Sequence, residues 1–148
     1  MNDDLKTPYE LFGIECGKGW HPILVPLFEY IEKYNIDKKN DEKIIIKQVK
    51  EKFGGLRFYC NFETDELNKL IRQAEAECNV TCELCGTKEN VGKTLGWITT
   101  CCEDCVKKMS ERRNHVIYRW KPLNCDENIK WYEFGQDKDK EPNYKLEN

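Results

Sequence analysis

The sequence predicts an α+β fold in which a β-hairpin packs with helices and a cysteine-rich, finger-like segment follows. Three observations predict it. Two stretches of strand-like composition flank a Gly-Gly pair, and an amphipathic stretch with an N-cap residue comes directly after them. Five of the chain's nine cysteines then fall within 25 of its 148 residues.

The two strand-like stretches are Ile44–Lys50 and Leu56–Phe62. The first is rich in β-branched residues, and the second alternates apolar and polar residues as a half-buried strand does. Between them, Gly54 and Gly55 supply the positive φ angles that a tight connection needs, so we expect a β-hairpin. Two residues beside the turn are expected to pack the hairpin on the helix that follows: Phe53 and Leu56.

A helix is expected directly after the hairpin. Thr64 is a suitable N-cap, and Asp65 and Glu66 place negative charge in the first turn, where the helix dipole favours it. The apolar residues of this stretch fall on one helical face: Leu67, Leu70, Ile71, Ala74 and Cys78.

Two further helices are expected. Apolar residues also recur at helical spacing in Gly17–Asn35, but Pro26 would break an interior turn, so the regular helix is expected to begin near Pro26. Another helix is expected from about Glu103 to Arg113. The aromatic-rich segment after it is expected to pack back on the domain.

Length and composition indicate one globular domain. The prediction is a single α+β domain over residues 1–135, with the finger embedded at about 80–113 and a polar tail at 136–148. No apolar run approaches the roughly 18 residues of a membrane span. The first ten residues are acidic and polar, unlike a signal peptide. We therefore expect a cytoplasmic protein that does not contact membranes, in which thiols stay reduced.

The cysteine cluster has the spacing of a metal site. Cys82 and Cys85 form one C-x₂-C pair, and Cys102 and Cys105 form a second after sixteen residues. Four thiolates surround one Zn²⁺ tetrahedrally when each pair is held on a tight turn, and such a closed shell is typical of a structural zinc site. A knuckle, a hairpin and a helix that carries the last pair would give a treble-clef-like arrangement.

The remaining cysteines are assigned no chemistry. Cys101 could replace Cys102 as a ligand, although the C-x₂-C spacing to Cys105 favours Cys102. The other four are interpreted as small buried hydrophobic residues: Cys16, Cys60, Cys78 and Cys125.

Enzymatic activity has weak support in the sequence. A treble-clef knuckle is the frame of HNH-type nucleases, and His115 follows the second cysteine pair. Such enzymes need a histidine that activates water and further ligands for a divalent ion, and one histidine cannot do both. We expect no catalytic residue, and an HNH-type nuclease stays a remote alternative.

Two basic stretches favour nucleic acid as a second class of partner. Between Lys43 and Cys60, five basic residues stand against Glu51 alone, and between Glu103 and Lys121, six stand against three acidic residues. Basic residues beside aromatic ones hold phosphates and stack bases. A solvated hairpin and helix face is the alternative interpretation. The candidate binding residues are Lys47, Lys50, Arg57, Arg112, Arg113 and Trp120.

Three stretches together resemble a known family. ECGKGWHPIL, QVKEKFGGLRFY and the TCELCG…GWITTCCEDC cluster stand in the order found in a family of small, mostly uncharacterised bacteriophage and prophage proteins. The resemblance covers about residues 13–105. Members usually carry a hydrophobic residue where Cys101 stands, which agrees with Cys102 as the ligand.

The resemblance implies a setting in the cytoplasm of an infected bacterium. Small accessory phage proteins often bind a host protein, and many inhibit defence enzymes such as CRISPR effectors. The first hypothesis is therefore a non-enzymatic, zinc-stabilised binding protein that acts on a host factor. The oligomeric state and the target are not predicted. Aromatic residues expected on the contact surface are Trp120, Trp131, Tyr132 and Phe134.

Overall fold

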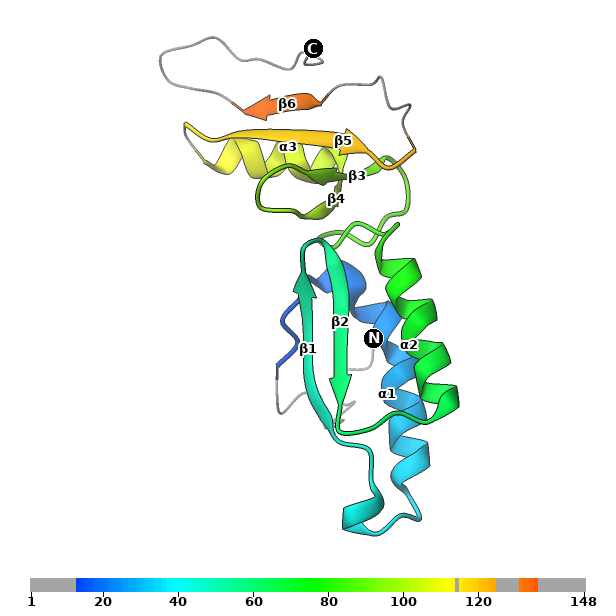
Figure 1. Ribbon diagram of the computed structural model, residues 1–148. Coiled ribbons are helices and arrows are strands. Elements are labelled where there is room, and N and C mark those ends of the chain that lie inside the picture. The colour runs from blue at the N-terminus through cyan, green and yellow to red at the C-terminus, as the bar shows by residue number, and fades with distance from the viewer. Residues whose placement is uncertain (1–12, 114, 125–130, 136–148) are drawn as a thin grey trace. The chain divides into compact units, whose positions relative to one another are not determined.

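The structure is a computed structural model that describes residues 13–113, 115–124 and 131–135 (Figure 1). The chain divides into two compact units, Met1–Asn79 and Val80–Asn148. Each contains helical structure and an antiparallel sheet, so the expected α+β class is confirmed. The single domain over residues 1–135 stays a prediction, and the tail at 136–148 lies outside the described residues.

The first helix of the first unit begins earlier than the sequence predicts. The 3₁₀ turn η2 (Lys18–Trp20) leads directly into α1 (His21–Asn35), which contains Pro26 in its interior. The prediction that the helix starts near Pro26 is therefore wrong. Pro22 and Pro26 are both exposed, so water can satisfy the carbonyl left without its intrahelical donor. The apolar face is continuous across that turn and outweighs the lost hydrogen bond: Ile23, Leu24, Leu27, Phe28 and Ile31 are buried.

The predicted hairpin is present with a shifted turn. Strands β1 (Ile46–Lys52) and β2 (Gly55–Cys60) pair antiparallel, with Lys52 opposite Gly55. The two turn residues are Phe53 and Gly54, which both have positive φ, as a two-residue hairpin turn requires. Gly55 does not adopt positive φ. Phe53 is 70% exposed, so the prediction that it packs inward is wrong, whereas Leu56 is buried as expected.

The helix after the hairpin is confirmed as α2 (Asp65–Cys78). The Thr64 hydroxyl accepts a hydrogen bond of 3.1 Å from the backbone N–H of Leu67 and caps the first turn. The phenol of Tyr30, on α1, lies 2.6 Å from the same hydroxyl and ties the two helices together.

The core of the first unit lies between the hairpin and these two helices. Phe28 on α1 meets Phe58 on β2 with ring centroids 5.7 Å apart. Burial of large apolar side chains supplies most of the stability of such a unit. The other buried members are Trp20, Ile23, Leu24, Leu27, Ile31, Ile44, Ile46, Val49, Leu56, Leu67, Ile71, Ala74 and Cys78.

The second unit is a four-stranded antiparallel sheet with one helix. The strand order is β4 (Thr100–Cys102), β3 (Val91–Thr94), β5 (Ile117–Pro122) and β6 (Tyr132–Gly135). Helix α3 (Glu103–Arg112) follows β4 without a linker. The hairpin expected between the two cysteine pairs is present as β3 and β4, and the aromatic segment after the helix returns as β5 and β6.

Trp120 is the centre of the second unit's small core. It is 1% exposed, its indole N–H donates to the carbonyl of Cys101 at 2.8 Å, and its ring packs on Tyr132 and Phe134. The expectation that Trp120 and Phe134 lie on a contact surface is therefore wrong, because both are buried. An aromatic residue at a strand position facing a helix is core more often than surface.

Among the residues that the structure describes, no helix has the length and apolar character that a bilayer span requires.

Candidate metal centre

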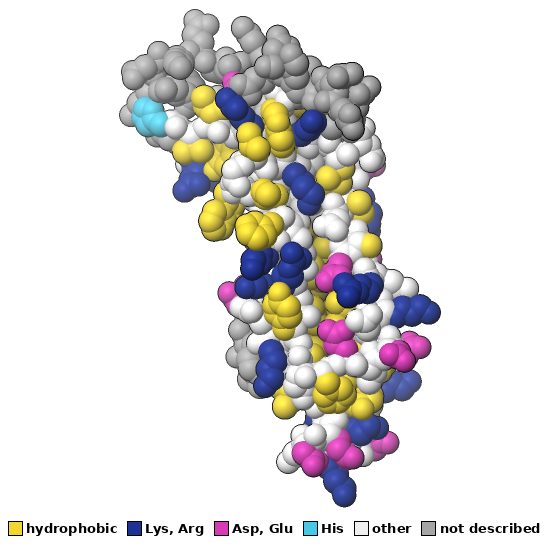
Figure 2. Space-filling model, viewed as in Figure 1, with side chains coloured by type: hydrophobic (Ala, Val, Ile, Leu, Met, Phe, Trp, Pro, Cys, Tyr) yellow, Lys and Arg dark blue, Asp and Glu magenta, His cyan; other side chains and the backbone are white. Residues whose placement is uncertain are grey.

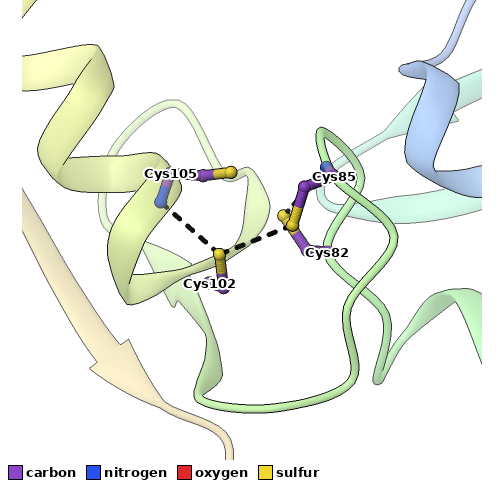
Figure 3. Close-up of side chains that lie close together, drawn as sticks. All are labelled: Cys82, Cys85, Cys102 and Cys105. Atoms are coloured by element: carbon purple, nitrogen blue, oxygen red, sulfur yellow. Dashed lines mark hydrogen bonds between the residues drawn. The ribbon is translucent and has the colours of Figure 1, made fainter.

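The four predicted ligands converge from three local structures (Figure 3). Cys82 and Cys85 lie on the loop before β3, where Cys82 N–H bonds the carbonyl of Thr87 and its own carbonyl accepts from Gly86 N–H. Gly86 has φ +85°, a conformation that favours glycine and closes this knuckle. Cys102 ends β4 and caps α3, and Cys105 lies in the first turn of that helix.

The sulfur positions fit one tetrahedral ion. All four Sγ atoms lie within 4.8 Å of one another, and those of Cys85 and Cys102 are 3.7 Å apart. Four sulfurs at about 2.3 Å from a central zinc would be about 3.8 Å apart along each edge. None of the eight cysteines that the structure describes forms a disulfide. The four cysteines are therefore positioned to bind a metal ion.

Backbone amides point at two of the sulfurs. The N–H of Cys85 lies 3.4 Å from Sγ of Cys82, and the N–H of Cys105 lies 3.4 Å from Sγ of Cys102. Burial raises the pKa of Cys82, but amide hydrogen bonds from Cys85, Cys102 and Leu84 outweigh it and leave that pKa below its usual range. These contacts stabilise thiolate charge and orient the ligands.

Cys102 and Cys105, the other two buried cysteines of the cluster, have a raised pKa. Burial raises the pKa of Cys105, and the hydrogen bond with Cys102 raises it further. Burial also raises the pKa of Cys102, against a lowering contribution from the amide of Cys105. Thiols packed this closely cannot all ionise alone, because their charges repel each other, whereas a bound cation favours the thiolates. Metal binding at this site therefore releases protons.

The structure separates Cys102 from the alternative ligand Cys101. Successive residues of a strand point to opposite faces, so only one of the two can face the cluster. Cys101 is fully buried and stands outside the four-sulfur group. Burial, then the charges of Cys82 and Cys102, raise the pKa of the Cys101 thiol to about 12. It packs as a small hydrophobic residue, as the spacing predicts.

The remaining cysteines and histidines lie elsewhere. Cys78 is buried, and Cys16 and Cys60 are half-buried in the first unit, while Cys125 lies outside the described residues. Burial, then Glu63, raise the pKa of Cys60 to about 12. His115 lies on the exposed turn between α3 and β5, and neither histidine belongs to the group of metal-competent residues found in the described part of the chain.

A surface hollow of about 290 Å³ adjoins the cluster. Cys85 is exposed, and three of the four ligands line the hollow together with polar and charged side chains. The ion would be reachable from solvent on this side, so chelators should be able to remove it. The polar and charged lining residues are Thr87, Glu89, Asn90, Glu103, Asp104 and Lys108.

The predicted basic binding residues fall into two groups. Lys47, Lys50 and Arg57 lie on the hairpin of the first unit, while Arg112 and Arg113 lie at the end of α3 in the second. Arg113 donates to the Tyr118 hydroxyl at 3.3 Å, which raises the pKa of Arg113. The structure therefore places the basic hairpin and the basic helix in separate units.

Sequence reasoning missed the side chain that is the most exposed large hydrophobic one in the described ranges. Trp97 lies between β3 and β4 and is 86% exposed. The neighbouring Gly96 has φ +84°, which marks a turn and is the signal that could have placed Trp97 at a hairpin tip.

Comparison of the chain with protein-family models, curated proteins and solved structures finds no match.

Proposed function

We propose that the four cysteines hold a structural Zn²⁺. Soft thiolate ligands in a tetrahedral set select zinc or iron over hard cations, and a complete four-sulfur shell leaves no position for substrate. The observation that supports this is the 3.7 Å separation of the Cys85 and Cys102 sulfurs, which matches the edge of a zinc tetrahedron. Elemental analysis of the pure chain should find one zinc per molecule; iron or no metal would contradict the assignment.

The chain on this proposal is a non-enzymatic binding protein. It acts on a host protein in the bacterial cytoplasm, and the resemblance to phage proteins makes a defence enzyme such as a CRISPR effector the leading candidate. The metal then serves to hold a recognition surface in one shape. Such a surface must be exposed, apolar at its centre and ordered before the partner arrives.

Trp97 is the observation that carries this proposal. It is 86% exposed and is flanked by Leu95 at 50%, so both expose apolar area that folding leaves unburied. Tryptophan is the residue type most enriched at the energetic centres of protein interfaces. Ile117, 40% exposed, belongs to the same unit.

Hydrogen bonds order the loop that carries Trp97. The Thr94 hydroxyl donates to the carbonyl of Trp97 at 2.7 Å and accepts from the N–H of Thr99 at 2.8 Å. The N–H of Leu95 bonds the carbonyl of Arg119 at 2.9 Å. A preformed tip loses little conformational entropy on binding, which favours affinity.

The test is quantitative affinity capture from the bacterial host with three tagged chains. Wild type and Ile36→Ala should recover the same host protein in stoichiometric amount, because Ile36 is equally exposed, at 81%, and lies in the other unit. Trp97→Ala should lose it by at least about tenfold. Equal recovery with Trp97→Ala would remove this surface from the proposal, and repeated recovery of no partner would remove the host-factor function itself.

A further inference from the structure

We propose that the outer face of the β1–β2 hairpin binds single-stranded nucleic acid. Lys50, Lys52 and Arg57 would contact phosphates, and Phe53 and Tyr59 would stack on bases. This activity goes beyond the proposed function, since it uses another surface in the other unit and needs no host protein.

The strand register defines the outer face. Val49 pairs with Phe58, and both are buried against the helices, so the residues on either side of them point away from the core. Figure 2 shows Lys and Arg side chains mixed with hydrophobic ones over this hairpin. From the bulge in β1 to the turn, three cross-strand pairs point outward. They are Gln48 with Tyr59, Lys50 with Arg57, and Lys52 with Gly55.

Two cations face each other on this surface. Lys50 and Arg57 are direct cross-strand partners, and like charges at such positions destabilise a hairpin. Lys52 adds a third positive charge one step along β1. Gly55 leaves room for the guanidinium, because a Cβ there would stand 3.3 Å from Nη1 of Arg57. The repulsion between the two cations does not stabilise the fold. A bound polyanion would neutralise both charges and relieve the repulsion, which favours binding.

Two acidic side chains adjoin the three cations, Glu15 on the outer face itself, and each accepts a hydrogen bond from another group. Glu51 accepts a hydrogen bond of 2.7 Å from the N–H of Gly54 and so stabilises the turn. Glu15, on the segment that bridges to Lys50, receives the side-chain amide of Gln48 at 3.3 Å. The cations on the outer face therefore have no cross-strand acidic partner among the six outward positions.

Phe53 carries two costs at the tip of the hairpin. Its φ of 53° is a conformation that large side chains rarely adopt, and 70% of its surface is exposed. Asparagine or glycine would suit this turn position better. The Lys52 ammonium lies 5.6 Å from the centroid of the Phe53 ring. Tyr59, on the outer face of the hairpin, is 44% exposed. Exposed rings beside cations are the combination that binds bases and phosphates together.

Single strands fit this face better than a duplex or an acidic protein. The outward positions contain the ring of Tyr59 and three cations, with Phe53 beside them at the turn, but no aliphatic side chain that a protein pocket would bury. A ring can stack only on a base whose face is open, which a duplex hides within its stack.

The experiment measures fluorescence anisotropy of labelled, mixed-sequence oligonucleotides about 16 nucleotides long. Single-stranded DNA, single-stranded RNA and the matching duplex DNA are titrated with the metal-loaded full chain at about 50 mM salt. We expect the single strands to bind more tightly than the duplex. Three phosphate contacts predict a fall in log affinity of about 2 per tenfold rise in salt.

Two substitutions separate binding from folding. Phe53→Asn suits the left-handed turn and should keep or raise stability while weakening binding at least about fivefold, because one stacked base is lost. Arg57→Glu creates an opposite-charge pair with Lys50, so it should stabilise the hairpin and weaken binding by about tenfold or more. Trp97→Ala, the control on the other surface, should bind nucleic acid like wild type.

Several results would overturn the inference. The inference fails if neither single strand binds at low salt, or if the duplex binds as tightly as the single strands. It also fails if Phe53→Asn and Arg57→Glu both bind like wild type. Competition by polyglutamate as strong as by oligonucleotide of equal charge would show instead a site for an acidic protein. None of these results bears on capture of a host protein through Trp97, so the two proposals fail separately.

Discussion

The two units of the chain are built on different sources of stability. Among its described residues, the first buries fifteen in one apolar cluster, including Trp20 and Phe28. The described part of the second buries eight in its cluster, of which four are cysteines. A unit with so small an apolar core needs a further constraint, and a bound metal at the four clustered cysteines would supply one. On the proposed function, the second unit is organised by its metal centre and the first by burial.

The two hairpins are alike at their tips and differ in how their charges are held. Lys50 faces Arg57 across the β1–β2 hairpin, whereas Lys93 faces Thr100 across the β3–β4 hairpin and faces Lys121 only on the neighbouring strand β5. Lys93 donates across its hairpin to Thr100 Oγ1 at 2.7 Å, and Lys121 lies 5.6 Å from the Trp131 ring centroid, whereas Arg57 donates to the carbonyl of its own neighbour Leu56 at 3.1 Å. This difference is why the nucleic-acid site is assigned to the first hairpin.

Loss of one ligand should give the largest effect and break the second unit alone. Cys82→Ala removes a metal site whose binding is worth about 10–16 kcal/mol in small zinc domains, so zinc content and amide protection of β3, β4, β5 and β6 should be lost. Elemental analysis and hydrogen exchange measure both. Cys101→Ala is the matched control, because this neighbour of a ligand is buried but outside the cluster. Zinc loss in the control as well would contradict the ligand assignment.

A core truncation should destabilise the first unit and leave the metal in place. Leu24 is fully buried, and Leu24→Ala should lower the free energy of unfolding of this unit by about 2–5 kcal/mol in urea titrations. Zinc content should not change. Ile36→Ala, at a residue 81% exposed, should stay within about 0.5 kcal/mol of wild type. A Leu24→Ala chain that loses zinc would show that the two units are not independent.

Packing within the second unit should give a smaller effect. Gly92 lies under the Trp120 ring, and a Cβ there would collide with that ring and with the carbonyl of Lys121. Gly92→Ala should cost about 1–3 kcal/mol in urea unfolding followed by tryptophan fluorescence. Gly96→Asn is the control, because nothing lies within 4 Å of its added Cβ and asparagine tolerates φ +84°. Equal losses in the two variants would mean that the close approach to Trp120 is not a constraint.

The smallest effect concerns a lone thiol of the first unit. The pKa of Cys60 rises from 9.0 to about 12 on folding, so the protonated form is favoured by the native state. The free energy of unfolding is therefore independent of this thiol below pH 9. It falls as the pH rises from 9 towards 12, because the unfolded chain loses the proton first. Relative to neutral pH, wild type should lose about 1 kcal/mol of unfolding free energy at about pH 10 through this thiol. Cys60→Val should not show that loss, and urea titrations at the two pH values measure it. Equal alkaline losses in wild type and variant would refute the assigned cause.

Local signals predicted much of this structure. The Thr64 cap and the apolar face behind it predicted α2 and its start at Asp65, because cap and periodicity agree there. Paired C-x₂-C spacing identified the four cysteines that cluster, since the geometry of a tetrahedral site constrains the sequence directly.

The failures share a cause, which is tertiary context. Apolar residues are buried on both sides of Pro26, and this burial extends α1 through the proline, where the local preference of proline predicts the helix start. The hairpin turn moved by one residue because register, set by burial of Val49 and Phe58, outweighed the preference for glycine. Trp120 could not be placed in the core without knowing that β5 pairs with β3, a long-range contact that composition does not encode.

The central claim is tested most directly by ¹H–¹⁵N spectra of the metal-loaded chain before and after chelation, and again after zinc is returned. We predict that amide signals from residues 80–135 collapse on chelation and recover with zinc, while those from residues 13–79 keep their positions. Retention of the second unit's signals without metal, or collapse of both units together, would contradict it.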